Sequence, residues 1–266
     1  MDRKPRVALL IDSDNSPASK IDLILNELST FGETSIRRAY GNWKKSELKS
    51  WEDVLHEHAI RPMQQFDYSK GKNASDIAMV IDALELLYTD KPDAFGIVSS
   101  DADFTPLVMH LRAKGAAVYG FRAQKTPEPF VNACSRFLYL ERLGVNDGPE
   151  LVQAETTFNT SPVEIASSPV KQAQPLRIPA EVLKKDLKLV SLLRGAVIAC
   201  EDEGGWCKVG AVRAHIGNKA SFDSRNYGYP TLSKLLAATG AFELRDEGTP
   251  KVNVRDKRHQ SLLLSK

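Results

Sequence analysis

The chain has 266 residues, of which 42% are hydrophobic and 26% charged, and its net charge is +2. These values are typical of a soluble globular protein with one large or two small domains, and they exclude a chain that is disordered throughout. The apolar run at 7–11 is too short for a signal-peptide core or a membrane span, so we expect a cytoplasmic protein. Three cysteines without paired CxxC spacing support neither a disulfide framework nor a zinc cluster.

Residues 144–180 are rich in Pro, Ser and Thr and show no helical or strand periodicity, which is typical of a semi-extended linker. We therefore expect one domain at 1–143 and a second at 181–266. The net charge is −1 over residues 1–144 and +5 over residues 181–266. This imbalance makes the second domain the first candidate for nucleic-acid contact.

Residues 1–143 alternate between predicted strands and predicted helices. The apolar runs predict strands at 7–11, 34–40, 60–66, 94–99 and 116–121, and helical periodicity predicts helices at about 17–30, 46–58, 75–88, 105–114 and 127–138. The alternation favours the α/β class, with a mostly parallel sheet covered by helices on both faces. In such sheets, ligands bind outside the carboxyl ends of the strands, at the point where the strand order reverses.

Acidic side chains follow the first and the fourth predicted strands. "VALLIDSDNSPASK" places Asp12 and Asn15 after the first strand, and "IVSSDADFTPLV" places Asp101 and Asp103 after the fourth. In both stretches a Ser-Pro or Thr-Pro pair is expected to cap the next helix, so the acids are not needed for capping. If the two strands are neighbours, these acids meet in one crevice.

Asp76 opens the predicted helix in "NASDIAMVIDALELLY" and is a further candidate for the same crevice. Since the helix dipole also favours an aspartate in the first turn, a purely structural role stays open. Asp82, six residues further on, lies on another face of the helix and is expected only to support the site. Lys70 and Lys72 precede the helix and are candidates for phosphate contact, with a solvated loop as the alternative. The expected buried face of this helix comprises Ile77, Val80, Ile81, Leu84 and Leu87.

Four ionised carboxylates in one crevice repel one another, so a cation is expected to bind there. All-oxygen sites suit Mg²⁺ or Mn²⁺, which activate water for attack on a phosphodiester. In this interpretation Asp12 and Asp101 bind the metal directly, and Asp76 and Asp103 complete the site or orient water. Asn15 is expected to hydrogen-bond a bound water or a phosphate.

Other interpretations of the same residues are weaker. "DSDNS" approaches the nucleophile motif of haloacid-dehalogenase-type phosphatases, but the later acids are more closely spaced than in that family. An EF-hand is excluded because Pro17 occupies the position of the loop glycine, and the "DAD" spacing alone is poor evidence for a glycosyltransferase. A non-catalytic RNA-binding adaptor with a structural metal site remains the main alternative.

Several ordered motifs of the first domain resemble the NYN domains of the LabA-like group in the PIN superfamily. They are "LLIDSDN", "KNASDIAMVIDALELLY", "FGIVSSDADFTPLVMHLRAKGAAVYGF" and "KTPEPFVNACSRFLYLE". The resemblance implies a PIN-like fold with strand order 3-2-1-4-5 and a metal-dependent ribonuclease site. The acidic positions of the family fall on Asp12, Asp76, Asp101 and Asp103, with Asn15 beside the first.

The second domain is predicted to contain three helices followed by a hairpin with "DEGTP" at its tip, as in a small winged helix. We expect Leu187, Val190, Leu193 and Val197 of the first helix and Leu232, Leu235 and Leu236 of the third to be buried. The motifs "EGGW", "SFDSRNYGYPTLSKLL" and "GAFELRD" resemble the OST-HTH or LOTUS domain, which implies a module that binds RNA or protein.

The basic residues of this domain are candidate phosphate contacts, although a solvated surface charge is the alternative for each. They are Lys208, Arg213, Lys219, Arg225 and Lys234. Trp206, Tyr227 and Tyr229 are expected to pack in the domain, with base stacking as the alternative. The two halves together predict a metal-dependent endoribonuclease whose RNA-binding module is tethered by the linker.

Overall fold

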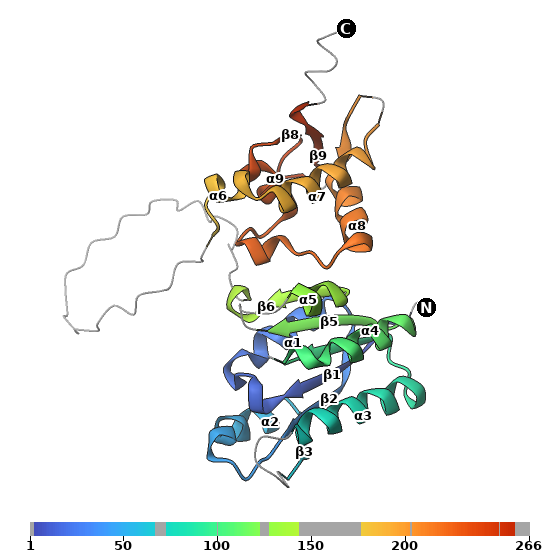
Figure 1. Ribbon diagram of the computed structural model, residues 1–266, viewed down its shortest axis with the longest axis vertical. Helices are drawn as coiled ribbons and strands as arrows, with labels where there is room; N and C mark the ends of the chain where they lie inside the picture. The colour runs from blue at the N-terminus through green and yellow to red at the C-terminus, as the bar shows by residue number, and fades with distance from the viewer. Residues whose placement is uncertain are drawn as a thin grey trace, which may run out of the picture.

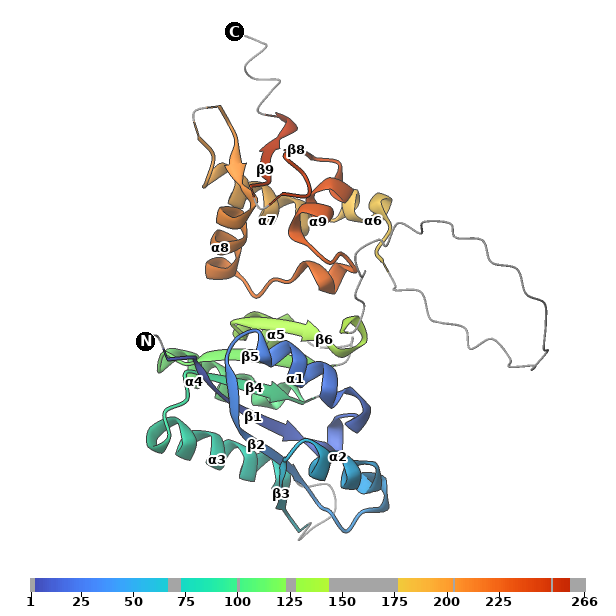
Figure 2. The same ribbon diagram turned by 180° about the vertical axis from the view of Figure 1, so that it is seen from behind.

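The computed structural model describes residues 3–66, 73–99, 101–122, 128–143, 177–202, 204–249 and 251–258. These residues form two domains, each with its own hydrophobic core (Figures 1 and 2). Across this part of the chain, no helix combines the length and the apolar character needed to cross a membrane.

The N-terminal domain is built on a six-stranded parallel sheet in the order β3-β2-β1-β4-β5-β6. Its elements are β1 (Arg6–Asp12), α1 (Ile21–Ser29), β2 (Glu33–Gly41), α2 (Glu52–Glu57), β3 (Arg61–Gln64), α3 (Ala74–Thr89), β4 (Ala94–Val98), α4 (Thr105–Ala113), β5 (Ala117–Arg122), α5 (Glu128–Ala133) and β6 (Arg136–Tyr139). Short 3-10 turns lie at η1 (Ser13–Asn15), η2 (Ala18–Lys20), η3 (Ser46–Trp51), η4 (Ala102–Phe104) and η5 (Leu140–Arg142). The predicted α/β class and the order 3-2-1-4-5 are confirmed, with a sixth strand added at one edge.

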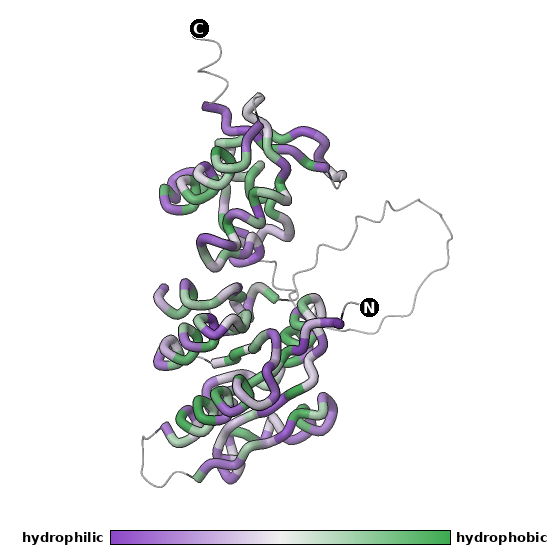
Figure 3. The backbone as a smooth tube through the Cα atoms, turned by 90° about the vertical axis from the view of Figure 1, so that its right-hand side faces the viewer, coloured by the Kyte–Doolittle hydropathy of each residue, from purple (hydrophilic) through white to green (hydrophobic). Residues whose placement is uncertain are grey.

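The central strand β1 shows how this sheet is covered on both faces. Val7, Leu9 and Ile11 enter the core formed with α1 and η3, and Ala8 and Leu10 enter the opposite core formed with α3 and α4. All five side chains are fully buried, as expected for a parallel strand between two helical layers. The hydropathy colouring in Figure 3 shows the same arrangement, with apolar strands inside a more polar outer layer.

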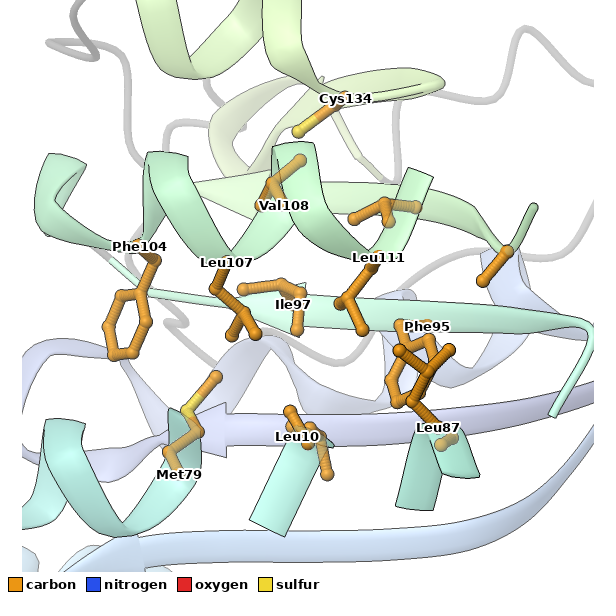
Figure 4. Close-up of a cluster of buried hydrophobic side chains, with 14 of the residues drawn as sticks. Leu10, Met79, Leu87, Phe95, Ile97, Phe104, Leu107, Val108, Leu111 and Cys134 are labelled. Carbon is orange, nitrogen blue, oxygen red and sulfur yellow. The ribbon is translucent and has the colours of Figure 1, made fainter. Parts of the chain in front are cut away.

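The predicted buried face of α3 is wrong at Ile77 and Ile81, which are 61% and 60% exposed. Leu87 is buried, and Val80 and Leu84 are partly buried against the core. Met79 instead points into the core between the sheet and α4 (Figure 4). Asp82 lies on this sheet-facing side, so the buried face contains a charged residue that an apolar pattern does not reveal.

The predicted helix at 127–138 is wrong in its second half. α5 ends at Ala133, and residues 136–139 form β6 parallel to β5. Phe137 of this strand is fully buried and meets Phe130 edge to face, with 6.1 Å between ring centroids. A strand of four residues is too short to show its own period beside an apolar helix.

The two predicted Ser-Pro and Thr-Pro caps are also absent. Ser16 donates to the carbonyl of Val98 at 3.3 Å, and α1 and α4 both begin after 3-10 turns without a side-chain cap. Asp101 accepts a hydrogen bond from the Asp103 amide at 2.8 Å and so caps η4. One of the surplus acids therefore does serve as a cap.

The C-terminal domain combines helices with a three-stranded sheet in the order β7-β9-β8. Its elements are α6 (Ala180–Lys185), α7 (Leu187–Ile198), β7 (Cys207–Lys208), α8 (Val209–Lys219), η6 (Ser224–Tyr227), α9 (Leu232–Thr239), β8 (Phe242–Arg245) and β9 (Asn253–Asp256). The predicted core residues of the first and third helices are buried except Leu187, which is 80% exposed. Leu187 is the first residue of α7, directly after the Asp186 cap, where the helix has not yet packed.

Candidate active site

The strand order reverses between β1 and β4, which lie side by side as parallel neighbours. Ile11 pairs with Val98 in the register, so the chain leaves both strands at the same edge of the sheet. Asp12 ends β1, and Asp101 and Asp103 follow β4 within the next five residues. The acids are thus at the switch point where α/β sheets bind ligands.

Asp12 is 1% exposed and anchors the site. Its Oδ2 accepts hydrogen bonds from Ser99 Oγ at 2.6 Å and from Asn15 Nδ2 at 3.0 Å. Its Oδ1 is buried and has no hydrogen-bond partner among the described residues. Burial raises the pKa of this carboxyl, and the hydrogen bonds from Ser99 and Asn15 offset only part of that rise.

Ser99 links the two strands through its hydroxyl group. It donates to Asp12 and accepts the backbone amide of Asp101 at 2.9 Å. Ser99 is 1% exposed, so this hydroxyl is fixed between the two acidic segments. The sequence prediction missed it, although its place at the end of β4 was visible in "SSDAD".

Asp76, in the first turn of α3, is half-buried in the same crevice. Burial raises its pKa to about 6, with further contributions from the charges of Asp12, Asp101, Asp14 and Asp103. Four other carboxylates therefore act on Asp76, and of the five acids four were predicted from the sequence.

Asp14 is the acid that the prediction left out. Its carboxylate accepts a hydrogen bond from Ser75 Oγ at 3.0 Å and pairs with Lys45 Nζ at 3.3 Å. It thereby joins η1 to the start of α3, next to Asp76. The signal was present in the Asp12–Asp14 spacing.

Asp82 is buried and contacts β2. It hydrogen-bonds Tyr40 and forms an ion pair with Arg38. Tyr40 pairs with Asp12 in the register of β1 and β2, so this network supports the strand end that carries Asp12. Burial, together with the charge of Asp82, raises the pKa of the Tyr40 hydroxyl, which stays protonated.

The crevice is not a closed coordination site. Within the residues that the structure describes, no three His, Cys, Asp or Glu side chains lie close enough to hold one metal ion. The carboxylates share an electrostatic field, but they do not converge on one point.

Four of the predicted phosphate contacts are exposed on the C-terminal domain: Lys208, Arg213, Lys219 and Lys234. A groove of about 260 Å³ between α8, α9 and the β8–β9 hairpin is lined by Arg213 together with Thr231, Ser233 and Thr249. Lys70 and Lys72 lie outside the described residues.

The fifth predicted phosphate contact of this domain, Arg225, lies at the boundary between the domains. Arg225 is partly buried and forms an ion pair with Glu27 of the N-terminal domain at 2.6 Å. Tyr229 is 5% exposed and packs in the core, as predicted. Trp206 lies between Arg245 and Arg255, whose guanidinium carbons are 4.3 and 4.5 Å from the ring centroid.

The model of the NYN domain matches residues 6–141, and that of the OST-HTH/LOTUS domain matches residues 181–254. The chain belongs to the NYN domain family. The uncharacterized protein MJ0482 of Methanocaldococcus jannaschii is 32% identical over 117 residues, which are 42% of this chain. The match spans 45% of that relative, slightly less than half its length.

A solved structure from Vibrio parahaemolyticus, of the protein of unknown function VPA0982, covers 55% of this chain and 96% of its own. Its sequence identity is 18% and its TM-score 0.43.

All five carboxylates of the crevice lie inside the residues matched by the NYN domain. The exposed cations Lys208, Arg213, Lys219 and Lys234 lie inside those matched by the OST-HTH/LOTUS domain. An NYN domain has a PIN-like nuclease fold, and an OST-HTH/LOTUS domain is an RNA-binding module.

Proposed function

We propose that this protein is a metal-dependent endoribonuclease that hydrolyses RNA phosphodiester bonds at the carboxylate crevice. The observation that carries the proposal is the position of Asp12, Asp101 and Asp103 behind the neighbouring strands β1 and β4, with Asp76 at the start of α3 close to them. Burial and the charges of the neighbouring carboxylates raise the pKa of Asp76 to about 6. A protein keeps so much like charge together at a ligand-binding edge when a cation compensates it.

The chemistry of the side chains fits Mg²⁺ or Mn²⁺, which prefer carboxylate oxygens and keep part of their shell for water and phosphate. The buried Oδ1 of Asp12, which lacks a partner among the described residues, is a candidate ligand atom. Asp76, Asp101 and Asp103 supply the other carboxylates. Because no three of them already converge, binding requires their side chains to turn toward a shared point.

A bound divalent ion supplies an activated water and neutralises charge on the phosphate. Asp12 and Asp101 would hold it, with Ser99 and Asn15 keeping the Asp12 carboxylate in place. Asp76 and Asp103 complete the site or orient the attacking water.

The OST-HTH domain would bind the RNA through its exposed cations. Lys208, Arg213 and Lys219 lie along β7 and α8, and Lys234 lies on α9. Phosphate contacts of this kind give affinity without reading the bases. Substrate choice would then depend on the shape and position of the RNA in the groove.

The test is cleavage of single-stranded and structured RNA in Mn²⁺, Mg²⁺ or EDTA by the native protein and by Asp12→Asn. We expect metal-dependent cleavage that falls at least about 100-fold in the variant. Asp53→Asn, an exposed acid on α2, is the matched control and should cleave normally. Tight RNA binding with equal background cleavage in all three proteins would instead favour the non-catalytic adaptor.

A further inference from the structure

The segment 221–228, which contains η6, lies against the edge strand β6 of the NYN domain. Both views of the molecule show the C-terminal domain next to β6 and α5 (Figures 1 and 2). We call this segment, whose sequence is "SFDSRNYG", the docking segment. Its contacts across the domain boundary involve a side-chain amide and a chain of four charges.

Asn226 pairs with β6 as an additional strand would. Its Nδ2 donates to the carbonyl oxygen of Phe137 at 2.9 Å, and its Oδ1 accepts the amide of Tyr139 at 3.2 Å. Residues two apart on a strand present their backbone groups on the same side, so one amide side chain satisfies both. Edge strands commonly need such a cover, because their open backbone groups otherwise pair with other chains.

The charges alternate in sign across the boundary. Arg225 donates to both carboxylate oxygens of Glu27 on α1, at 2.6 and 2.7 Å. It also donates to Asp223, which in turn forms an ion pair with Arg136 of β6 at 2.6 Å. Forked pairs between arginine and carboxylate are among the strongest and most directional polar contacts.

The two carboxylates among these four charged residues are buried, and each forms an ion pair with an arginine of the opposite domain. Asp223 is 3% exposed and Glu27 9%. A buried carboxylate without a partner is strongly unfavourable, so each arginine compensates a charge that is buried while the domains are docked. Glu27 pairs with Arg225 across the boundary, and Asp223 pairs with Arg136 across it and with Arg225 of its own domain. Asp223 also accepts the backbone amide of Arg225 at 2.9 Å, which fixes the turn that presents Asn226.

The described residues at the boundary also enclose a pocket beside Asn226. Its volume is about 310 Å³, and it is lined by Tyr139 from one domain and by Ile178 and Phe222 from the other. Side-chain packing is therefore incomplete at this point, where the docking segment makes its directional hydrogen bonds and ion pairs.

We propose that residues 221–228 fix the OST-HTH domain on the β6 edge of the NYN domain, so that the two move as one unit, and that Arg225 serves this interface rather than RNA. The sequence alone had predicted a module on a long tether. With docking, the groove of the OST-HTH domain keeps a constant orientation relative to the carboxylate crevice. The docking itself does not depend on the proposed nuclease activity.

The test uses full-length protein and two variants, Asn226→Ala and Glu27→Gln. Hydrogen exchange of the Tyr139 amide reports on docking, and we expect it to accelerate at least about fivefold in both variants. Amides of β1 should stay equally protected, which shows that the NYN domain remains folded. The radius of gyration from small-angle X-ray scattering should increase in the same variants.

Glu128→Gln is the matched control, because Glu128 also pairs across the boundary, with Lys188 at 3.3 Å. The side chains of this ion pair are largely exposed, 78% for Glu128 and 86% for Lys188, so the variant should show the exchange and scattering of the native protein. Unchanged exchange and scattering in Asn226→Ala and Glu27→Gln would overturn the proposal. A scattering mass of two chains would also overturn it, since docking would then occur between copies.

RNA binding separates the two parts of the proposal. If Arg225 acts through docking, Arg225→Gln and Asn226→Ala should lower RNA affinity by the same factor. A loss confined to Arg225→Gln would show that this arginine contacts RNA and would overturn its assignment to the interface. If no RNA binds at all, the proposed function fails, while the exchange and scattering results still decide the docking.

Discussion

The carboxylate crevice and the docking interface both contain buried acids, but the acids of the interface are paired with arginines, whereas those of the crevice lie beside other acids. At the interface, Asp223 and Glu27 each meet an arginine within 2.6 Å. In the crevice, burial and like charges raise the pKa of Asp76 to about 6. At the interface, burial alone would raise the pKa of Asp223, but the hydrogen bond from Arg225 and the charges of Arg136 and Arg225 lower it below its ordinary value.

This contrast separates a structural use of charge from a functional one. Paired charges stabilise one arrangement of the chain, and breaking a pair leaves its partner buried and uncompensated. Crowded like charges destabilise the chain until something else binds. The comparison predicts that removing a carboxylate lowers the stability of the fold at the interface and raises it in the metal-free crevice.

The largest effect is expected for Asp223→Asn, which leaves Arg136 and Arg225 without their shared carboxylate. We expect the free energy of unfolding to fall by about 2–4 kcal/mol near neutral pH. Because the folded-state pKa of Asp223 is lowered, its stabilisation is present above the ordinary value of 3.8 and is lost as the pH falls through the folded value. The difference between native and variant in thermal unfolding should therefore shrink below about pH 4.

Glu243→Gln is the control for this experiment. Glu243 pairs with Arg255 at 2.6 Å in the same domain, but its side chain is 41% exposed. Its removal should cost less than about 1 kcal/mol. Equal losses in the two variants would show that burial of Asp223 does not distinguish the interface from a surface pair.

Ser99→Ala removes two hydrogen bonds of the crevice without changing its charge. Loss of the hydroxyl frees Asp12 Oδ2 from its shortest contact and releases the Asp101 amide. We expect RNA cleavage to fall about 10- to 100-fold, with a weaker apparent affinity for Mn²⁺. Ser16→Ala, which removes a hydroxyl that donates to the Val98 carbonyl at the same sheet edge, should retain activity. Equal losses of RNA cleavage in Ser99→Ala and Ser16→Ala would show that removing any hydroxyl at this sheet edge impairs activity, and that Ser99 has no special role.

Much of this arrangement was predictable from the sequence because it depends on local patterns. The buried run of β1 and the acids behind β1 and β4 predicted the sheet and its carboxyl edge. Ser99 and Asp14 were missed because their roles depend on which strands and helices become neighbours. The burial of Ile77 and Ile81 was predicted wrongly for the same reason, since apolar residues on a helix do not identify the element against which the helix packs.

The docking interface was beyond sequence reasoning altogether. Glu27 and Arg225 are 198 residues apart, and each alone is an ordinary charged residue. Asn226 carries no signal for edge pairing, because the strand that it covers was itself predicted as a helix. Contacts between domains require both folds and their relative placement, which periodicity does not provide.

Asp76→Asn should change the stability of the fold in the opposite direction to Asp223→Asn. Removing one of the crowded charges should raise the melting temperature in EDTA by about 2 °C, a small effect because the group is only half-buried. Mn²⁺ should then stabilise the native protein more than the variant, since the variant offers one charged ligand fewer. Asp53→Asn should change neither value. A lower melting temperature for Asp76→Asn in EDTA would contradict the view that the crevice is strained by like charges.

The smallest effect is expected for Arg213→Gln, in the exposed groove of the OST-HTH domain. Arg213 lines this groove with Thr231 and Ser233, whereas Arg225 is engaged at the interface. Loss of one phosphate contact should weaken RNA binding a few-fold and reduce the slope of log Kd against log salt by about one unit. Lys185→Gln removes the same charge from α6, away from the groove, and should reduce affinity less. If the two variants bind RNA equally well, the positive charge of the domain acts only as a diffuse field, and the groove is not where the phosphates lie.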